Sequence, residues 1–349
     1  MARDILTLFG IDAPIVLGPF GGLSSIALTA SVSRGGGLGS FGLYAYSGDR
    51  IRETAAALRD ATSRPFALNL WLPTGDEVEP GDADLAAARA ATAPLFASAG
   101  ATPPPLPDVF LPSLDEQLDA VWDAAPAVLS VVFGVPAADV VAEAHRRGIR
   151  VVGTATSVAE AVALAAGGVD AIVASGAEAA GHRVSFLRRA EDSLVGALAL
   201  VPQVVDAVDV PVVAAGGIAD RRGVAAAFAL GASGVQVGSA FLRTRQSAAS
   251  DAHRDALRTA ADTDTILTRA MSGRLARGIP NRAVRTIEET DAVAPFPAQN
   301  WLTGAFRAAA RDDADLISLW AGQAAGLSRS DDADEVFAEL AAGVPARSR

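Results

Sequence analysis

Residues 210–244 read VPVVAAGGIADRRGVAAAFALGASGVQVGSAFLRT, and this stretch decides the fold. It contains two short apolar runs, residues 211–215 and 234–237, which are typical of buried parallel strands. The residues between these runs, 220–230, have the composition of a helix, and Asp220 is a suitable N-cap. The stretch therefore predicts a strand, a helix and a second strand in succession, which is the repeating unit of an α/β protein.

Both of these strands end in turns that have almost no side chains. Gly216-Gly217 ends the first strand, and Gly238-Ser239 follows the second. Glycine allows close backbone approach, so the backbone N–H groups of such turns can hold an anion, typically a phosphate. In (β/α)8 barrels the loops after the seventh and eighth strands commonly do so. The alternative is that the glycines only make tight turns.

The same alternation of short apolar strands and helices runs through most of the chain. Six further strands are predicted before this stretch, at residues 14–17, 38–41, 66–70, 128–133, 150–153 and 171–174. Helices are predicted at residues 24–33, 49–60, 114–123, 137–147, 157–166 and 193–208. The total of eight strands favours a closed (β/α)8 TIM barrel over an open sheet.

Two segments interrupt this rhythm. Residues 71–112, rich in Pro, Ala, Asp and Gly, are too long for a simple connection, although a disordered surface loop is the alternative there. Residues 245–299 combine helical sequence with a glycine- and arginine-rich turn region at 271–281. We expect both segments to be insertions that form a lid or substrate-side subdomain over the C-terminal face. The barrel would then comprise residues 1–70, 113–244 and 300–349, with its closing helix after residue 300.

Composition excludes several kinds of chemistry. The chain of 349 residues has no cysteine, so disulfides, thiolate nucleophiles and cysteine-ligated metal centres are ruled out. All 29 basic residues are arginine, which rules out Schiff-base lysine catalysis and a P-loop lysine. A formal charge of −11 argues against a nucleic-acid partner. Since neither a signal peptide nor a membrane-spanning segment is evident, we expect a soluble, cytoplasmic protein.

His182 is the strongest candidate for catalysis among the three histidines. His145 and His253 lie in polar helical sequence, and we expect both at the surface. His182 instead follows a predicted strand, on the face where barrel enzymes place their catalytic groups. It could act as a base or donate a hydrogen bond to an anion, and a structural role in the loop is the alternative. Only Glu178 lies near enough in sequence to share a metal ion, so no metal site is predicted.

Two polar residues lie within or at the end of apolar strands. Asn69 is flanked by Leu68 and Leu70, which is unusual for a turn asparagine, and its amide could hydrogen-bond a planar heterocycle. Gln236 lies inside the last strand, where its side chain must be satisfied inside the barrel or by a ligand.

Six motifs, in this order along the chain, resemble the nitronate monooxygenase family, formerly called 2-nitropropane dioxygenases. They are GPFGG, LNLW, SGAEAAGHR, VVAAGGI, GVQVGSAF and SGRLARGIPN, which begin at residues 18, 68, 175, 212, 234 and 272. The resemblance covers nearly the whole chain, down to WAGQAAG at residues 320–326. It implies an FMN-dependent TIM barrel that needs no metal.

The resemblance also implies roles for individual residues. In the family, the flavin phosphate lies on turns that match Gly216, Gly217, Gln236, Val237, Gly238 and Ser239. Pro19, Phe20 and Asn69 match positions that meet the flavin ring, and His182 matches the active-site histidine. Two departures concern the same site: Ser175 stands where the family often has glutamine, and Ala180-Gly181 stands where it often has two glycines.

The activity implied is oxidation of alkyl nitronates, or of nitroalkanes, with O2 to a carbonyl compound and nitrite. One electron would pass from the nitronate to FMN before the oxygen chemistry, while His182 holds the nitro group or deprotonates a neutral nitroalkane. The same superfamily includes NAD(P)H-dependent flavin reductases of enoyl thioesters or quinones, which is the first alternative. A non-catalytic barrel that binds flavin or another phosphate is the second, and a homodimer is left open.

Overall fold

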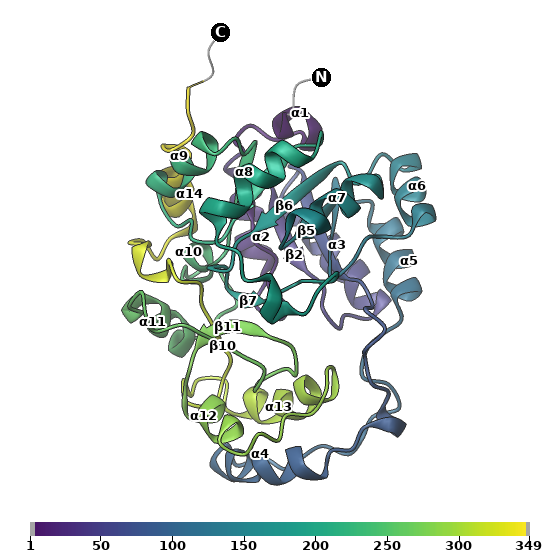
Figure 1. Cartoon of the computed structure of the whole chain (residues 1–349), viewed down its shortest axis with the longest axis vertical. Helices are drawn as coiled ribbons and strands as arrows, with labels where there is room; N and C mark the ends of the chain where they lie inside the picture. Colours follow the sequence, from purple (N-terminus) through teal and green to yellow (C-terminus); the bar gives the residue numbers. More distant parts are fainter. Residues whose placement is uncertain (1–3, 347–349) are drawn as a thin grey trace.

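The structure, a computed structural model, is described here for residues 4–346 (Figure 1). Its main sheet contains β1 (Ile15–Leu17), β2 (Gly39–Gly42), β3 (Phe66–Trp71), β4 (Val128–Val132), β5 (Arg150–Ala155), β6 (Ala171–Ser175), β8 (Val212–Ala215) and β9 (Gly234–Val237). All neighbours in this sheet are parallel, in the order β1-β9-β8-β6-β5-β4-β3-β2. A parallel bridge between Val16 and Leu38 joins the two outer strands and closes the ring. The predicted (β/α)8 TIM barrel is therefore confirmed, and each predicted strand is present within a few residues.

Helices surround the barrel because each begins after a strand and packs an apolar face on the sheet. They are α2 (Ile26–Arg34), α3 (Gly48–Ala61), α5 (Leu114–Ala124), α6 (Ala138–Arg146), α7 (Val158–Ala166), α8 (Ala197–Ala207) and α9 (Arg221–Ala229). Side chains of Ser or Asp cap the first turns of most of them, as at Ser25 and Asp220. The last helix, α14 (Ala333–Ala341), packs against α2, α9 and β1 and completes the ring.

Two apolar layers fix the shape of the barrel. Inward-facing residues of the strands, such as Val128 and Val213, form a core inside the ring. Helix α1 (Ile5–Phe9) closes the amino-terminal end of this core with Ile5 and Phe9. The second and larger layer fills the space between the strands and the surrounding helices. Since the amino-terminal end is plugged, the carboxyl ends of the strands are left to form a site.

A smaller unit, which we call the cap, lies over the carboxyl ends of the strands (Figure 1). It contains η1 (Pro80–Asp82), α4 (Ala86–Ser98), α11 (Asp251–Thr259), β10 (Ile266–Thr268), β11 (Ala276–Ile279), α12 (Arg282–Glu288), α13 (Ala298–Ala309) and β12 (Leu319–Trp320). Helices α4, α12 and α13 share one apolar core. The segment 71–112 therefore packs on the segment that follows residue 245, although the two are far apart in sequence.

Three features differ from the sequence predictions. Residues 271–281, expected to form a turn region, contain the strand β11, which pairs with β10 and β12 and, on the barrel side, with β7 (Gly181–His182). The helix expected from residue 193 begins at Ala197, after a short 3-10 turn, η2 (Ala190–Ser193). The carboxylate of Glu178 accepts the Ala197 N–H at 3.0 Å and so caps the helix where it starts.

The third difference is His253, which was expected at the surface and is only 1% exposed. It shares one face of α11 with Leu257, one helical turn later, and both are buried. Its ring Nε2 lies 3.0 Å from the carbonyl oxygen of Trp320. His145 lies in the last turn of α6 as expected, with its ring Nε2 2.8 Å from the carboxylate of Asp170.

The division into barrel and insertions remains a proposal, and the packing of the last segment refines it. Helix α13 packs with α4 in the cap, although most of it lies in the segment 300–349 that we assigned to the barrel. The helix of that segment that completes the barrel is α14. No helix within residues 4–346 has the length and apolar character needed to cross a membrane.

Candidate active site

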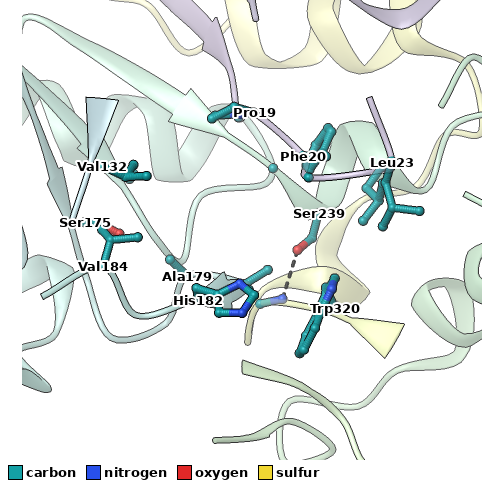
Figure 2. Close-up of a pocket in the computed structure, with 18 of the residues that line it drawn as sticks. Pro19, Phe20, Leu23, Val132, Ser175, Ala179, His182, Val184, Ser239 and Trp320 are labelled. Carbon is teal, nitrogen blue, oxygen red and sulfur yellow. Dashed lines mark hydrogen bonds between the residues drawn. The ribbon is translucent and has the colours of Figure 1, made fainter. Parts of the chain in front are cut away.

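A cavity of about 420 Å³ lies at the carboxyl ends of the barrel strands, beneath the cap. Its volume falls within the range of small-molecule sites, roughly 300–1,000 Å³. The sequence-predicted residues that line it are Pro19, Phe20, Asn69, Ser175, Ala180, Gly181, His182, Gly216, Gly217, Gln236, Gly238 and Ser239. Figure 2 shows Pro19, Phe20, Ser175, His182 and Ser239 around this space. Residues from five separate stretches of the chain thus meet in one place.

Val237 is the one predicted site residue that does not line the cavity. Its side chain is fully buried in the layer between strands and helices. Side chains alternate across a strand, so the neighbouring Gln236 takes the inward direction. The carbonyl oxygen of Val237 accepts a hydrogen bond from the N–H of Gly18 at 2.8 Å. Val237 therefore holds the backbone just before Pro19 in place.

The turns after β8 and β9 form a surface of backbone atoms. Gly216 and Gly217 have φ values of +98° and +74°, which side chains rarely adopt. A Cβ atom at Gly216 would lie 3.2 Å from the backbone of Gly176, so this position also needs glycine for close packing. Within residues 4–346, the backbone N–H groups of Gly217 and Ser239 donate to no protein acceptor. Free N–H groups beside a surface without side chains suit an anion such as a phosphate.

Polar side chains of the barrel strands also line the cavity. Asn69 is only 2% exposed and donates its Nδ2 to the Ser130 hydroxyl at 2.8 Å, which leaves its carbonyl oxygen as an acceptor. The side chains of Ser175 and Gln236 form no hydrogen bond within the part of the chain that the structure describes. Polar groups left without partners in a barrel interior are expected to serve a ligand.

His182 lies between the barrel and the cap rather than in a free loop. It is the second residue of β7, which pairs with Ala276 of β11. Its ring meets Trp71 edge-on, with ring centroids 4.9 Å apart, and lies 5.5 Å from the ring of Trp320. Figure 2 shows the His182 and Trp320 rings side by side, near the hydrogen bond of 2.9 Å that the Gly322 N–H donates to the Ser239 hydroxyl.

The surroundings of His182 keep its ring neutral. Burial, together with the charges of Arg274 and Arg307, lowers the pKa of His182 to about 3. The hydroxyl of Ser272 lies 2.8 Å from Nε2 and 3.1 Å from the carbonyl oxygen of Arg274. Its single hydrogen can serve only one of these acceptors, and that choice sets which ring nitrogen of His182 carries the proton.

Several lining residues were not predicted from the sequence. They include the aromatic residues Tyr44, Trp71, Phe296 and Trp320 and the polar residues Asn300 and Arg307. Tyr44 and Trp71 have ring centroids 4.4 Å apart, and Trp71 stacks near Phe296 at 5.9 Å. Only 5% of the chain is aromatic, so such a cluster around one cavity is a signal, but these residues are spread over nearly 280 positions. Trp71 could have been predicted, because it lies two residues after Asn69 in the same strand and such residues face the same side of a sheet.

The two insertions are joined at the rim of the cavity by Arg274. Its Nη2 lies 2.7 Å from the carboxylate oxygens of both Asp76 and Glu77 and 2.5 Å from the Thr74 hydroxyl. The same guanidinium lies 3.9 Å from the ring centroid of Phe296. We call this charged contact the Arg274 clamp. The side chains of Arg274 and Glu77 are only 10% and 19% exposed, whereas that of Asp76 is 74% exposed, so the clamp is buried on the arginine side and open to solvent at Asp76.

Comparison with known proteins gives consistent matches over the whole chain. The family model for nitronate monooxygenase matches residues 3–343. A curated protein of Staphylococcus aureus (strain Newman), named a probable nitronate monooxygenase, is 36% identical over 347 residues, which cover 95% of this chain and 94% of that protein.

Two solved structures extend the match to three dimensions. A nitroalkane oxidase from Streptomyces ansochromogenes aligns with a TM-score of 0.85 and 35% identity, covering 98% of this chain and 97% of that one. FabK from Thermotoga maritima aligns with a TM-score of 0.76 and 28% identity, covering 97% and 95%. An enoyl reductase domain from Bacillus amyloliquefaciens, at 13% identity and a TM-score of 0.67, shares the fold.

Proposed function

The chain belongs to the nitronate monooxygenase family, and on that premise we propose that it is an FMN-dependent enzyme that oxidises alkyl nitronates with O2 to a carbonyl compound and nitrite. Enzymes of this family are flavin-dependent oxidoreductases, so the alternative of a non-catalytic barrel is set aside. The choice of FMN, the nitronate substrate and the roles of the residues are the substance of the proposal.

The cavity has the parts that FMN needs. The backbone of Gly216-Gly217 and Gly238-Ser239 would hold the phosphate, because its N–H groups are free and no side chain intrudes. Asn69 would accept a hydrogen bond from the flavin ring through its free carbonyl oxygen. Ser175 and Gln236, which have no partners in the described part of the chain, would meet the remaining polar groups. When bound, the flavin supplies electron transfer from the nitronate and the reaction with O2.

The observation that carries the proposal is the position of His182, whose ring lies in the wall of the cavity between the rings of Trp71 and Trp320. With a pKa of about 3, His182 is uncharged at neutral pH and a weak base. Such a group is poorly suited to deprotonate a nitroalkane, which favours the ready-made nitronate as the substrate. If the Ser272 hydroxyl donates to Nε2, then Nδ1 carries the hydrogen and can donate it to a nitronate oxygen.

The other residues of this region position the substrate and exclude water. The rings of Trp71 and Trp320 contact His182 from the barrel and from the cap. The Arg274 clamp joins the segment 71–112 to the segment that contains β11, and so holds the two parts of the cap together. The aromatic rings exclude water from the space that they fill, and a lower local dielectric strengthens a hydrogen bond to an anionic substrate.

The test is the response of the purified protein to two reductants without oxygen. A yellow protein whose flavin is bleached by ethyl nitronate, but not by NADPH, supports the proposal. Bleaching by NADPH alone would instead establish the alternative, a flavin reductase of enoyl thioesters or quinones. A colourless protein that takes up no FMN would mean that the glycine turns hold some other phosphate.

A substitution then tests His182 itself. His182→Asn should keep FMN, because none of the proposed phosphate contacts involves the imidazole, and should lose most turnover of ethyl nitronate. The matched control is His145→Asn, which changes a histidine on the outer surface of α6. Unchanged steady-state kinetics in His182→Asn would refute the assigned role.

A further inference from the structure

Arg307 of α13 is a cation in the wall of the cavity whose charge the protein leaves unbalanced. Its Nη1 donates to the Ser318 hydroxyl at 3.1 Å, and its Nη2 donates to the backbone and side-chain oxygens of Asn300 at 3.0 and 2.7 Å. All these acceptors are neutral. Within residues 4–346 no carboxylate forms an ion pair with Arg307, and its buried Nε has no acceptor.

Arg274, the second cation beside His182, shows the opposite arrangement. Asp76 and Glu77 both contact its guanidinium, so the Arg274 clamp carries its own counter-charges. Burying a guanidinium without a counter-charge costs free energy, and a ligand that supplies the negative charge would offset that cost. Burial lowers the pKa of Arg307 to about 10, so the side chain remains a cation at neutral pH.

Tyr44 adds a neutral donor to the same wall. The Asn300 Nδ2 donates to the Tyr44 hydroxyl oxygen at 3.0 Å, which leaves the phenolic hydrogen without a protein acceptor in the described residues. Burial raises the pKa of Tyr44 to about 12, so this hydrogen is retained at neutral pH. Asn300 thus links the guanidinium of Arg307 to the hydroxyl of Tyr44, and all three residues line the cavity.

We propose that Arg307, Asn300 and Tyr44 form the site that holds the two oxygens that share the negative charge of the substrate. This inference rests on the proposed function, because the anion that this site would bind is the nitronate substrate of that reaction. A nitronate and a carboxylate are both planar groups that share one negative charge between two oxygens, and a guanidinium matches that shape. The aromatic rings of Trp71 and Phe296, which lie against Tyr44, would enclose the attached alkyl chain.

The site can be tested without turnover by using propanoate as the probe. Propanoate has the shape and charge of ethyl nitronate but cannot be oxidised in the same way, and propanamide is its neutral counterpart. Binding is measured by quenching of tryptophan fluorescence in the holoenzyme, where Trp71 borders the site, and as competition against ethyl nitronate. We expect propanoate to bind and to compete, and propanamide to do neither over the same concentrations.

Three variants assign the binding to these residues. Arg307→Met should weaken propanoate binding and raise the KM for ethyl nitronate by roughly ten- to a hundredfold, the value of a hydrogen bond to a charged group. Arg307→Lys keeps the charge without the planar fork and should lie between Arg307→Met and the parent protein. Tyr44→Phe keeps the ring and should weaken propanoate binding several-fold. The control is Arg282→Met, an exposed arginine of the cap that does not line the cavity.

The outcomes separate this inference from the proposed function. If propanoate binding depends on Arg307 and Tyr44 while ethyl nitronate is not oxidised, the anion site stands and the reaction is another one. If Arg307→Met and Tyr44→Phe both bind propanoate as the parent does, the inference is wrong, whatever the activity. Loss of FMN affinity in Arg307→Met with unchanged propanoate binding would also overturn it, since Arg307 would then serve the cofactor. Tyr44→Phe decides the question should Arg307→Met fail to fold.

Discussion

Gly217 offers a direct test of the proposed phosphate site because the chain contains a matched control. Gly217 and Gly148 have the same φ, +74°. A Cβ atom at Gly217 would meet only the side chain of Glu178, at 3.7 Å, and one at Gly148 would meet nothing within 4 Å. Alanine at either position therefore adds no clash, and it costs about 1–2 kcal/mol of backbone strain in both cases.

The two positions differ in what surrounds them. Gly217 lines the cavity, and its free N–H is one of the donors proposed for the phosphate, whereas Gly148 lies after α6 on the outside of the barrel. A methyl group at residue 217 would occupy the space of the phosphate and keep it from that N–H. A hydrogen bond to a charged group contributes roughly 1.5–3 kcal/mol, so the Kd for FMN should rise by roughly ten- to a hundredfold.

The assay is titration of FMN and of riboflavin into flavin-free protein, followed by flavin fluorescence. Gly217→Ala should lose affinity for FMN and little affinity for riboflavin, which has no phosphate. Gly148→Ala should bind both as the parent protein does, and thermal unfolding should show a similar loss of stability in the two variants. Equal FMN affinity in both variants, or an equal loss for riboflavin in Gly217→Ala, would refute the phosphate assignment.

Three further predictions concern the cap and the core. Glu77→Gln should weaken the Arg274 clamp by roughly 1–3 kcal/mol, and hydrogen exchange should then be faster in residues 72–79; unchanged exchange would contradict the role of the clamp. Burial lowers the pKa of His253 to about 4. As the pH is lowered from about 6.5 to 4, the unfolded chain binds a proton at this histidine that the folded protein does not, so the free energy of unfolding decreases by up to roughly 3 kcal/mol. Urea unfolding at pH 7 and pH 4.5 should show a smaller fall in His253→Gln than in the parent. Phe306 is fully buried in the cap, and Phe306→Ala should lower the free energy of unfolding by about 3–5 kcal/mol. Leu198 is 74% exposed, and Leu198→Ala should change the free energy of unfolding by no more than about 0.5 kcal/mol. Similar losses in the two variants would show that the cap core contributes little to stability.

The barrel could be predicted from the sequence because its signals are local. Each strand is a short apolar run, and its ends are marked by glycine or by a helix cap within a few residues. The turn at Gly216-Gly217 needs positive φ values, and only glycine adopts them at low cost, so the sequence itself marks the place. For the same reason the side of the cavity that we propose for the cofactor could be predicted from the sequence: it is made of strand ends and their turns.

The cap could not be predicted in the same way because its elements depend on distant partners. Strand β11 contains Ala276 and Gly278, which are poor strand formers in isolation, and it is held by pairing with β7, β10 and β12. The guanidinium of Arg277 donates to the carbonyl oxygen of Ala177 at 2.9 Å, a partner 100 residues away. The burial of His253 could not be seen in the polar sequence of α11 either, because the partner of its ring is a backbone carbonyl of the distant strand β12.

This contrast has a consequence for how the two halves of the cavity are specified. The barrel side presents backbone N–H groups and small polar side chains, which can hold one cofactor whatever the substrate is. The cap side presents Phe296, Asn300 and Arg307, whose side chains define the charge and shape of the remaining space. We therefore expect a change of substrate to require changes in these side chains and in Tyr44, Trp71 and His182 on the barrel side, with the fold and the proposed phosphate site intact. Since Arg307 lines the cavity and forms no ion pair within the described chain, exchanging it should alter substrate charge preference before it alters flavin binding.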